Sequence, residues 1–181
     1  MGYRGIDPKE LKGNVFELID DKWFLITAKK YKTDGKVNTM TASWGFMGIM
    51  WAKPVVNVVV RPVRYTYEFL EEADYFTLSF FSGEYRKALN ILGTKSGRDG
   101  DKIKESGLTL LDYNLSETME DEIKGKTATF KEAEITMTCK KLYYQDIDPA
   151  NFQCEEIDKN YPNKDYHRMY LGEIISCVVK E

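Results

Sequence analysis

The sequence has little histidine and little cysteine, and these two shortages exclude several kinds of functional site. His167 is the only histidine among the 181 residues. A metal site built from several histidines is therefore impossible, and a Ser-His-Asp triad would have to use this one residue. The three cysteines, Cys139, Cys154 and Cys177, lie far apart and form no Cys-x-x-Cys pair. They indicate neither a disulfide framework nor a zinc site.

The chain also lacks an excess of positive charge and any long apolar run. Lys and Arg number 26 against 29 Asp and Glu, which gives a net charge of −3. General nucleic-acid binding is disfavoured, because it depends on cationic side chains that meet phosphates. No apolar run approaches the length that spans a membrane, and the N-terminus lacks the apolar stretch of a secretion signal. We expect one domain over residues 1–181 that stays in the cytoplasm.

Short apolar and aromatic runs rich in β-branched residues dominate the chain and predict strands. The expected strands cover residues 15–19, 23–31, 38–46, 55–60, 75–81, 108–113, 133–144 and 169–179. Asp34-Gly35 between the second and third runs predicts a tight hairpin turn, because both turn positions favour positive φ.

Helix signals are fewer. The expected helices cover 66–74, about 83–92 and 101–105, with Thr66 as the first N-cap and Gly93 and Gly107 as the stops. Many strands without regular βα alternation favour a closed barrel over a doubly wound sheet. Residues 145–168 form a long polar segment, which is either a binding element or a plain surface excursion.

Residues 38–46 would have two unlike faces if they form one strand. Thr39, Thr41, Ser43 and Gly45 would share a face of small hydroxyl and bare-backbone positions. Such a strip lets a flat polar heterocycle lie close to the main chain. An ordinary solvent-facing side has the same composition, so both interpretations stay open.

A cationic segment follows the apolar run 55–60. Arg61-Pro62-Val63-Arg64-Tyr65-Thr66 stands where a helix is expected to begin. Two guanidinium groups, a hydroxyl and the positive end of a helix suit a phosphate monoester. The alternative is a pair of solvated arginines beside a plain N-cap. Further along, 95–102 combines glycines with cations and is either an anion-binding loop or a polar surface loop.

The order of these pieces resembles the flavin reductase-like family, including the flavoredoxins. The matching pieces are NTMTASWGF, VVNVVVRPVRYTYEFL, YFTLSFFS, KSGRDGDKI and DYHRMYLGEI, and the resemblance runs from about Asn14 to the C-terminus. It implies an FMN-binding split β-barrel of the Greek-key type, mainly β with a few short helices. It also implies a homodimer.

The resemblance further implies which residues hold FMN. The segment that lines the isoalloxazine ring corresponds to Asn38, Thr39, Met40, Thr41, Ala42, Ser43 and Trp44. The ribityl and phosphate end corresponds to Arg61, Pro62, Arg64, Tyr65 and Thr66, with further contacts from Ser96, Gly97 and Lys102. No side chain is expected to act as acid, base or nucleophile, and no metal site is expected.

His167 departs from the family pattern, in which Asp-His-x-x-Phe-x-Gly-Glu often precedes the final strand. Here an extra residue separates Asp165 from His167, and Tyr170 stands in place of the phenylalanine. Two interpretations stay open. His167 lies at the edge of a mobile loop with an ordinary pKa, or it lies near the flavin or a nicotinamide as a donor or proton relay.

Three functions are compatible with the sequence. The favoured one is a flavoprotein that moves electrons between NAD(P)H and an acceptor, with the flavin supplying the chemistry. The second is an FMN-containing electron carrier of the flavoredoxin type, which takes electrons from a redox protein. The third is a barrel that binds another phosphorylated heterocycle, such as pyridoxal phosphate.

Overall fold

The computed structural model describes residues 2–111 and 123–181. Its strands are β1 (Tyr3–Ile6), β2 (Phe24–Lys29), β3 (Val37–Ala42), β4 (Gly45–Met50), β5 (Lys53–Val60), β6 (Tyr75–Phe80), β7 (Leu110–Leu111), β8 (Thr129–Phe130), β9 (Ile135–Asp146) and β10 (Arg168–Lys180). Its helices are α1 (Tyr65–Glu72), α2 (Arg86–Thr94), α3 (Lys102–Ser106) and α4 (Glu155–Asp158). Shorter helical turns are η1 (Pro8–Glu10), η2 (Glu17–Asp21), η3 (Gly83–Tyr85) and η5 (Pro149–Asn151).

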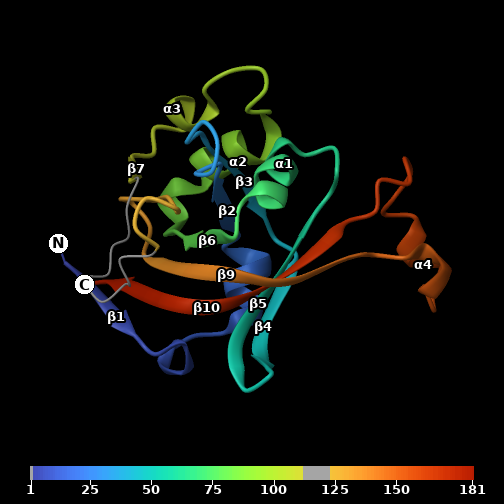
Figure 1. The fold of residues 1–181 in the computed structure, drawn as a ribbon, viewed down its shortest axis with the longest axis horizontal. Coiled ribbons are helices and arrows are strands. Elements are labelled where there is room, and N and C mark those ends of the chain that lie inside the picture. The colour runs from blue at the N-terminus through green and yellow to red at the C-terminus, as the bar shows by residue number, and fades with distance from the viewer. Residues whose placement is uncertain (1, 112–122) are drawn as a thin grey trace.

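One curled antiparallel sheet contains most of the described strands. The strand order is β3-β2-β6-β9-β10-β5-β4, and β1 pairs with β10. β3 and β4 stand at opposite ends of this order although only Ser43 and Trp44 separate them in the chain. The sheet must therefore curl until its ends approach each other, as can be followed in Figure 1. The result is a split β-barrel with a few short helices, which confirms the predicted fold class.

The barrel interior and the helices bury β2 from both sides. Phe24 and Ile26 belong to the barrel core, whereas Leu25 belongs to a second apolar cluster that includes Leu89 and Leu92 of α2. All six residues of β2 are buried for this reason. Burial on both faces explains why the apolar residues Phe24, Leu25 and Ile26 follow one another in β2 and do not alternate with polar residues.

One predicted strand is wrong, and another is divided in two. Residues 15–19 are helical, and residues 17–19 belong to η2, in which the neighbouring residues Leu18 and Ile19 are both buried. A helical turn can bury two successive residues, whereas a strand with one exposed face would expose one of them. Residues 38–46 form two strands, because the chain leaves β3 after Ala42 and enters β4 at Gly45.

The predicted turn and helix signals need smaller corrections. Between β2 and β3 the loop runs from Lys30 to Lys36, and Gly35 alone takes a positive φ there, at 71°. α1 has Arg64 at its N-cap position, so Thr66 is inside the helix and is not its cap.

The second predicted helix begins as η3 and continues as α2 through Gly93 to Thr94. The third ends at Gly107, as predicted. Of the predicted strand 108–113, only β7 is formed within the described chain, and 112–113 lie outside the described residues.

The long polar segment begins and ends on paired strands. Asp146 at the end of β9 pairs with Arg168 at the start of β10. Residues 147–167 extend beyond this pair, carry η5 and α4, and project from the barrel in Figure 1. We call residues 147–167 the excursion. No helix among residues 2–111 and 123–181 is long and apolar enough to cross a membrane.

Candidate functional site

The bend between β3 and β4 forms one wall of an open cleft at the split of the barrel. Gly45 makes this bend possible, because its φ is 155° and a Cβ atom there would lie 2.5 Å from the backbone oxygen of Asn57. The cleft has a volume of about 250 Å³. Its lining residues are Met40, Thr41, Ala42, Ser43, Trp44, Val59, Arg61, Arg64, Gly93 and His167. We call it the first cleft.

Five consecutive residues, 40–44, line the first cleft, so it does not follow one side-chain face of β3 as predicted. β3 is a terminal strand of the described sheet and pairs there with β2. Its other edge carries backbone N–H and C=O groups that the sheet does not use. The cleft therefore offers main-chain donors and acceptors together with small side chains.

Arg64 supplies a positive charge that lacks a counter-charge. Its Nη2 donates to the backbone oxygen of Gly93 at 2.6 Å, and no carboxylate of the described residues pairs with it. Burial lowers the pKa of Arg64 below its usual value, and the nearby charge of Arg61 lowers it further. A half-buried guanidinium with a cationic neighbour and no acid favours an anion from outside the chain.

Arg61 has a different set of contacts. Its Nη1 donates to both carboxylate oxygens of Asp165 at 3.1 Å, and its Nη2 donates to the backbone oxygen of Asn160 at 2.9 Å. Its guanidinium also lies over the ring of Tyr161, with 5.2 Å between the guanidinium carbon and the ring centroid. Arg61 therefore ties the excursion to the rim of the first cleft, and Asp165 offsets its charge.

His167 and Trp44 form the aromatic part of the cleft wall. Their ring centroids are 5.3 Å apart, and Trp44 is 47% exposed whereas His167 is 8% exposed. Burial lowers the pKa of His167 to about 4, the charge of Arg61 adds to this, and Asp165 opposes it. His167 is therefore neutral near pH 7. This contradicts the interpretation of His167 as a mobile-loop residue with an ordinary pKa.

A smaller recess continues the first cleft over α2. It shares four residues with the first cleft and adds Trp23, Leu89, Asn90 and Thr94. Thr41 Oγ1 donates to the backbone oxygen of Leu89 at 2.5 Å, which fixes β3 against the helix. Gly93 passes so close to Thr41 that a Cβ atom would lie 3.2 Å from Thr41 Cβ. The small residue at position 93 therefore leaves the floor of the cleft open.

A second, larger cleft of about 840 Å³ lies between the β2–β3 loop, α1 and α3. It is lined by Gly35, Lys36, Val37, Asn38, Tyr65, Phe69, Gly97, Gly100, Asp101, Lys102, Ile103, Lys104, Leu108 and Leu110. Lys102 Nζ donates to the backbone oxygens of Leu92 at 3.0 Å and Lys95 at 3.2 Å. Burial lowers the pKa of Lys102 to about 8, and Arg64 adds to this. We call this the second cleft.

Asn38 and Gly97 meet in the wall of the second cleft. Asn38 Nδ2 donates to Thr66 Oγ1 at 2.9 Å, and a Cβ atom on Gly97 would lie 2.4 Å from Asn38 Oδ1. The glycine is needed here for close approach. This contact joins three sequence segments that were predicted to serve one ligand.

The structure thus divides the predicted site residues into three groups. The first cleft brings together Met40, Thr41, Ala42, Ser43, Trp44, Arg61 and Arg64. The second cleft brings together Asn38, Tyr65, Gly97 and Lys102. Thr39, Pro62, Thr66 and Ser96 line neither cleft.

The four residues outside the clefts have other surroundings. Thr39 is fully buried, and its hydroxyl bonds with Thr27 Oγ1 at 2.8 Å and the backbone oxygen of Ile26 at 3.0 Å. Thr66 is buried beside Asn38, and Pro62 is exposed at the turn after β5. Ser96 is half-buried and accepts a bond from the backbone N–H of Arg98 at 3.2 Å.

Sequence reasoning missed Val59, Gly93, Tyr161 and Asp165. Val59 was assigned to the apolar run of β5, and Gly93 was interpreted as a helix stop. Tyr161 and Asp165 lie in the excursion, whose path no pattern in the sequence predicts. The one available signal was the single histidine at the end of that segment.

Comparisons with known proteins agree with this fold. A family model described as the flavin reductase like domain matches residues 19–181. The chain is similar to the structure of an FMN-binding domain of a flavin reductases-like enzyme from Shewanella baltica, with a TM-score of 0.66, 17% identity, and coverage of 98% of this chain and 77% of that one. It is similar to a flavoredoxin from Methanosarcina acetivorans, with a TM-score of 0.64, 20% identity, and coverage of 97% and 77%. It is also similar to an NADH:FAD oxidoreductase from Streptomyces globisporus, solved in complex with NAD and FAD fragments, with a TM-score of 0.61, 14% identity, and coverage of 88% and 74%.

Proposed function

This chain belongs to the flavin reductase-like domain family, and from that premise we propose that it binds FMN in the first cleft and passes electrons through it. One observation carries the choice of cleft: Arg64 is a half-buried cation with no carboxylate partner in the described chain. A phosphate provides the missing negative charge and accepts forked N–H donors.

The residues of the first cleft fit the two ends of such a ligand. Arg64 would hold the phosphate, with Arg61 adding positive potential although two of its nitrogens are already engaged. The unused backbone edge at 41–43 and the ring of Trp44 would hold the flat heterocycle. The flavin, when bound, accepts and donates electrons or a hydride, and the protein positions and polarises it.

We propose FMN over FAD because the first cleft contains one cation that is free of a carboxylate. The second phosphate of FAD would have to compete with Asp165 for Arg61. The relative from Streptomyces globisporus is an FAD oxidoreductase, so the choice needs a direct test. Fluorescence titration with both flavins provides it, and tighter binding of FAD would overturn the choice of FMN.

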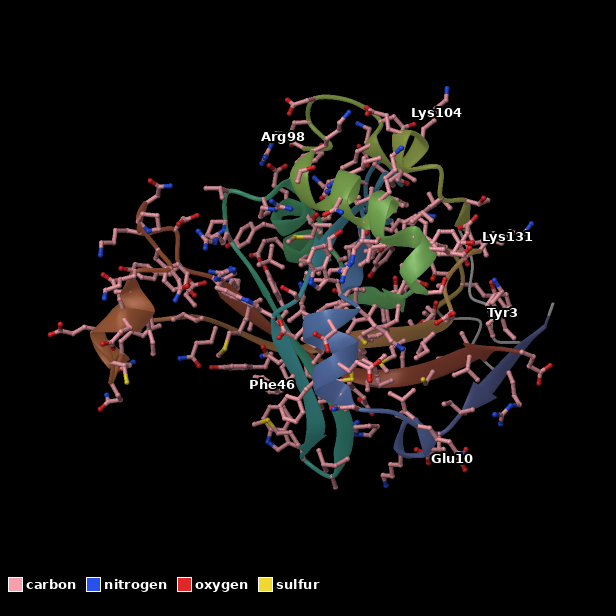
Figure 2. The ribbon with its side chains drawn as sticks, turned by 180° about the vertical axis from the view of Figure 1, so that it is seen from behind. Tyr3, Glu10, Phe46, Arg98, Lys104 and Lys131 are labelled. Carbon is pink, nitrogen blue, oxygen red and sulfur yellow. The ribbon has the colours of Figure 1, made fainter. Side chains whose placement is uncertain are left out.

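We also propose that the protein is a homodimer. The first cleft is small for a cofactor site and open, so another surface is needed to enclose a flavin. β4 is an edge strand of the described sheet and exposes Phe46, Ile49 and Met50, and Trp51 in the turn that follows β4 is exposed as well. Figure 2 shows Phe46 beside the β4–β5 hairpin. An exposed apolar patch on an edge strand favours association, and sedimentation of the purified protein tests it.

The electron donor separates the two leading functions. We favour an NAD(P)H-dependent flavin oxidoreductase, because the first cleft is open enough for a nicotinamide to approach a bound flavin. Stopped-flow bleaching of the bound flavin by NADH or NADPH tests this. Slow bleaching by both would favour the flavoredoxin-type carrier, which takes electrons from a redox protein. The three cysteines are free, in keeping with the reducing cytoplasm in which we propose that the protein acts.

A barrel for another phosphorylated heterocycle is the remaining alternative. The visible spectrum of the freshly purified protein distinguishes it, because a bound oxidised flavin is yellow and pyridoxal phosphate absorbs at shorter wavelength. A colourless protein that also fails to bind added FMN would overturn the proposed function.

A further inference from the structure

We propose that Tyr161 is a positioning residue that holds His167 in one neutral tautomer, with its Nε2–H presented to the ligand of the first cleft. Under the proposed function that ligand is the flavin, so the ligand part of this inference rests on it. The tautomer itself is a property of the chain alone.

The contact between the two side chains is direct and buried. Tyr161 Oη lies 2.9 Å from His167 Nδ1, and the rings meet edge to face with 5.4 Å between their centroids. Tyr161 is 4% exposed and His167 is 8% exposed. Arg61 lies over the ring of Tyr161 and is itself tied to Asp165. The phenol is therefore fixed on one side of the imidazole.

Both groups are neutral near pH 7, so one proton lies between the oxygen and the nitrogen. Burial raises the pKa of Tyr161, which keeps the phenol protonated, and the imidazole carries no charge at this pH. Two arrangements are then possible. Either Tyr161 O–H donates to Nδ1, or Nδ1–H donates to the phenol oxygen.

The two arrangements differ in whether the phenol proton has an acceptor. If Nδ1–H were the donor, the phenol proton would need a further acceptor, and none is recorded for Tyr161 Oη within residues 2–111 and 123–181. A buried hydroxyl without an acceptor is costly. If Tyr161 O–H is the donor, the phenol proton and Nδ1 are both satisfied, and the imidazole proton must be on Nε2.

The other ring nitrogen, Nε2, belongs to a residue that lines the first cleft. It makes no hydrogen bond in the described chain, and it is absent from the fully buried polar atoms that lack a partner, which are Asn57 Oδ1 and Arg86 Nη1. Together with the place of His167 in the cleft wall, this leaves Nε2 accessible to a ligand. A fixed, neutral N–H donor stabilises negative charge that develops on an adjacent ring and keeps its own proton at pH 7.

The single histidine makes the test clean. Tag-free protein labelled with 15N contains one imidazole, and long-range proton–nitrogen spectra distinguish a protonated from an unprotonated ring nitrogen. We expect a protonated Nε2 and an unprotonated Nδ1 in the protein without ligand. A protonated Nδ1 would overturn the inference.

Two variants separate positioning from general packing. Tyr161→Phe keeps the ring and removes the donor, so both nitrogens should move toward the averaged shifts of exchanging tautomers. Tyr166→Phe is the matched control, because the Tyr166 hydroxyl donates to Asp158 at 2.8 Å in the same excursion. Its imidazole signals should match the unmodified protein. Unchanged signals in Tyr161→Phe would refute the positioning role.

Addition of FMN tests the ligand part. We expect the Nε2 signal to shift on binding, and we expect His167→Phe to weaken FMN binding roughly 2- to 10-fold, the range for one neutral hydrogen bond. His167→Gln, which keeps an N–H donor, should recover part of this loss. FMN that binds without moving the His167 signals would overturn this inference alone. FMN that fails to bind would overturn the proposed function and the ligand part with it.

Discussion

Replacement of Arg64 by alanine removes the one cation of the first cleft that no carboxylate of the described chain neutralises. Arg64 donates one hydrogen bond, to the backbone oxygen of Gly93, and its other guanidinium N–H groups remain available. Burial, and to a smaller extent the neighbouring charge of Arg61, already disfavour the charged form of Arg64. The variant should therefore affect phosphate binding far more than folding.

The magnitude follows from the two roles of the side chain. A hydrogen bond to a charged group contributes about 1.5–3 kcal/mol, which corresponds to a roughly 10- to 150-fold loss of FMN affinity. For the empty protein, the lost bond to Gly93 costs about 1 kcal/mol, and relief of the repulsion with Arg61 offsets part of it. The free energy of unfolding should change by less than about 1 kcal/mol.

Riboflavin provides the internal comparison, because it lacks the phosphate and keeps the ring. In fluorescence titrations, Arg64→Ala should weaken FMN binding and leave riboflavin binding unchanged. Arg4→Ala removes the same charge at an exposed position on β1, where Arg4 pairs with Glu181, and should alter neither affinity. Equal losses for FMN and riboflavin, or no loss for FMN, would refute the assignment of the phosphate to Arg64.

Three further predictions concern the fold around the first cleft. Gly45→Ala should destabilise the fold by about 2 kcal/mol or more, because the added Cβ would meet the backbone oxygen of Asn57. Gly48→Ala in the same strand is the control, because a Cβ there meets nothing within 4 Å, and equal shifts of the two variants in thermal unfolding would contradict this. Protonation of His167 is disfavoured in the fold, so the stability that the neutral imidazole contributes is fully present above pH 6.5 and is lost as the pH falls toward 4. In urea unfolding, the free energy of unfolding of the unmodified protein should fall over this pH range by up to about 3 kcal/mol more than that of His167→Gln. Parallel pH profiles of the two proteins would refute this. Asp165→Asn breaks the pair with Arg61 and should speed proteolysis within the excursion, unlike Glu156→Gln on the exposed face of α4; equal cleavage rates would show that the pair does not hold the excursion.

The sequence predicted the barrel well where burial is simple. β5 and β6 are nearly or wholly buried runs, so composition alone identifies them. It failed at 15–19, where buried Leu18 and Ile19 suit a helical turn as well as a strand. It also failed at the bend after Ala42, because no local pattern shows that Gly45 must approach Asn57 closely. That approach depends on pairing between β4 and β5.

The site was predictable only in part, for a similar reason. The motif from Arg61 to Thr66 and the segment 95–102 were expected to serve one ligand because the family resemblance implies it, and nothing in a linear sequence shows that they line two clefts. In the structure, Arg61 and Arg64 line the first cleft, whereas Gly97 and Lys102 line the second, and Lys102 bonds to the carbonyl groups of Leu92 and Lys95. Lys102 therefore stabilises the end of a helix. Its predicted contact with a phosphate stays a prediction.

The two arginines of the motif are alike in sequence and unlike in the fold. Arg61 is paired with Asp165 and supports Tyr161, and its charge lowers the pKa of both Arg64 and His167. It thus favours a neutral imidazole at one end of the first cleft and an external anion at the other. Burial is the larger cause of the low pKa of His167, and the positive field of Arg61 adds to it; a phosphate bound beside Arg64 would offset this added contribution. A rise in the pKa of His167 when inorganic phosphate is added, measured on the single imidazole, would reveal this coupling, and an unchanged pKa at saturating phosphate would refute it.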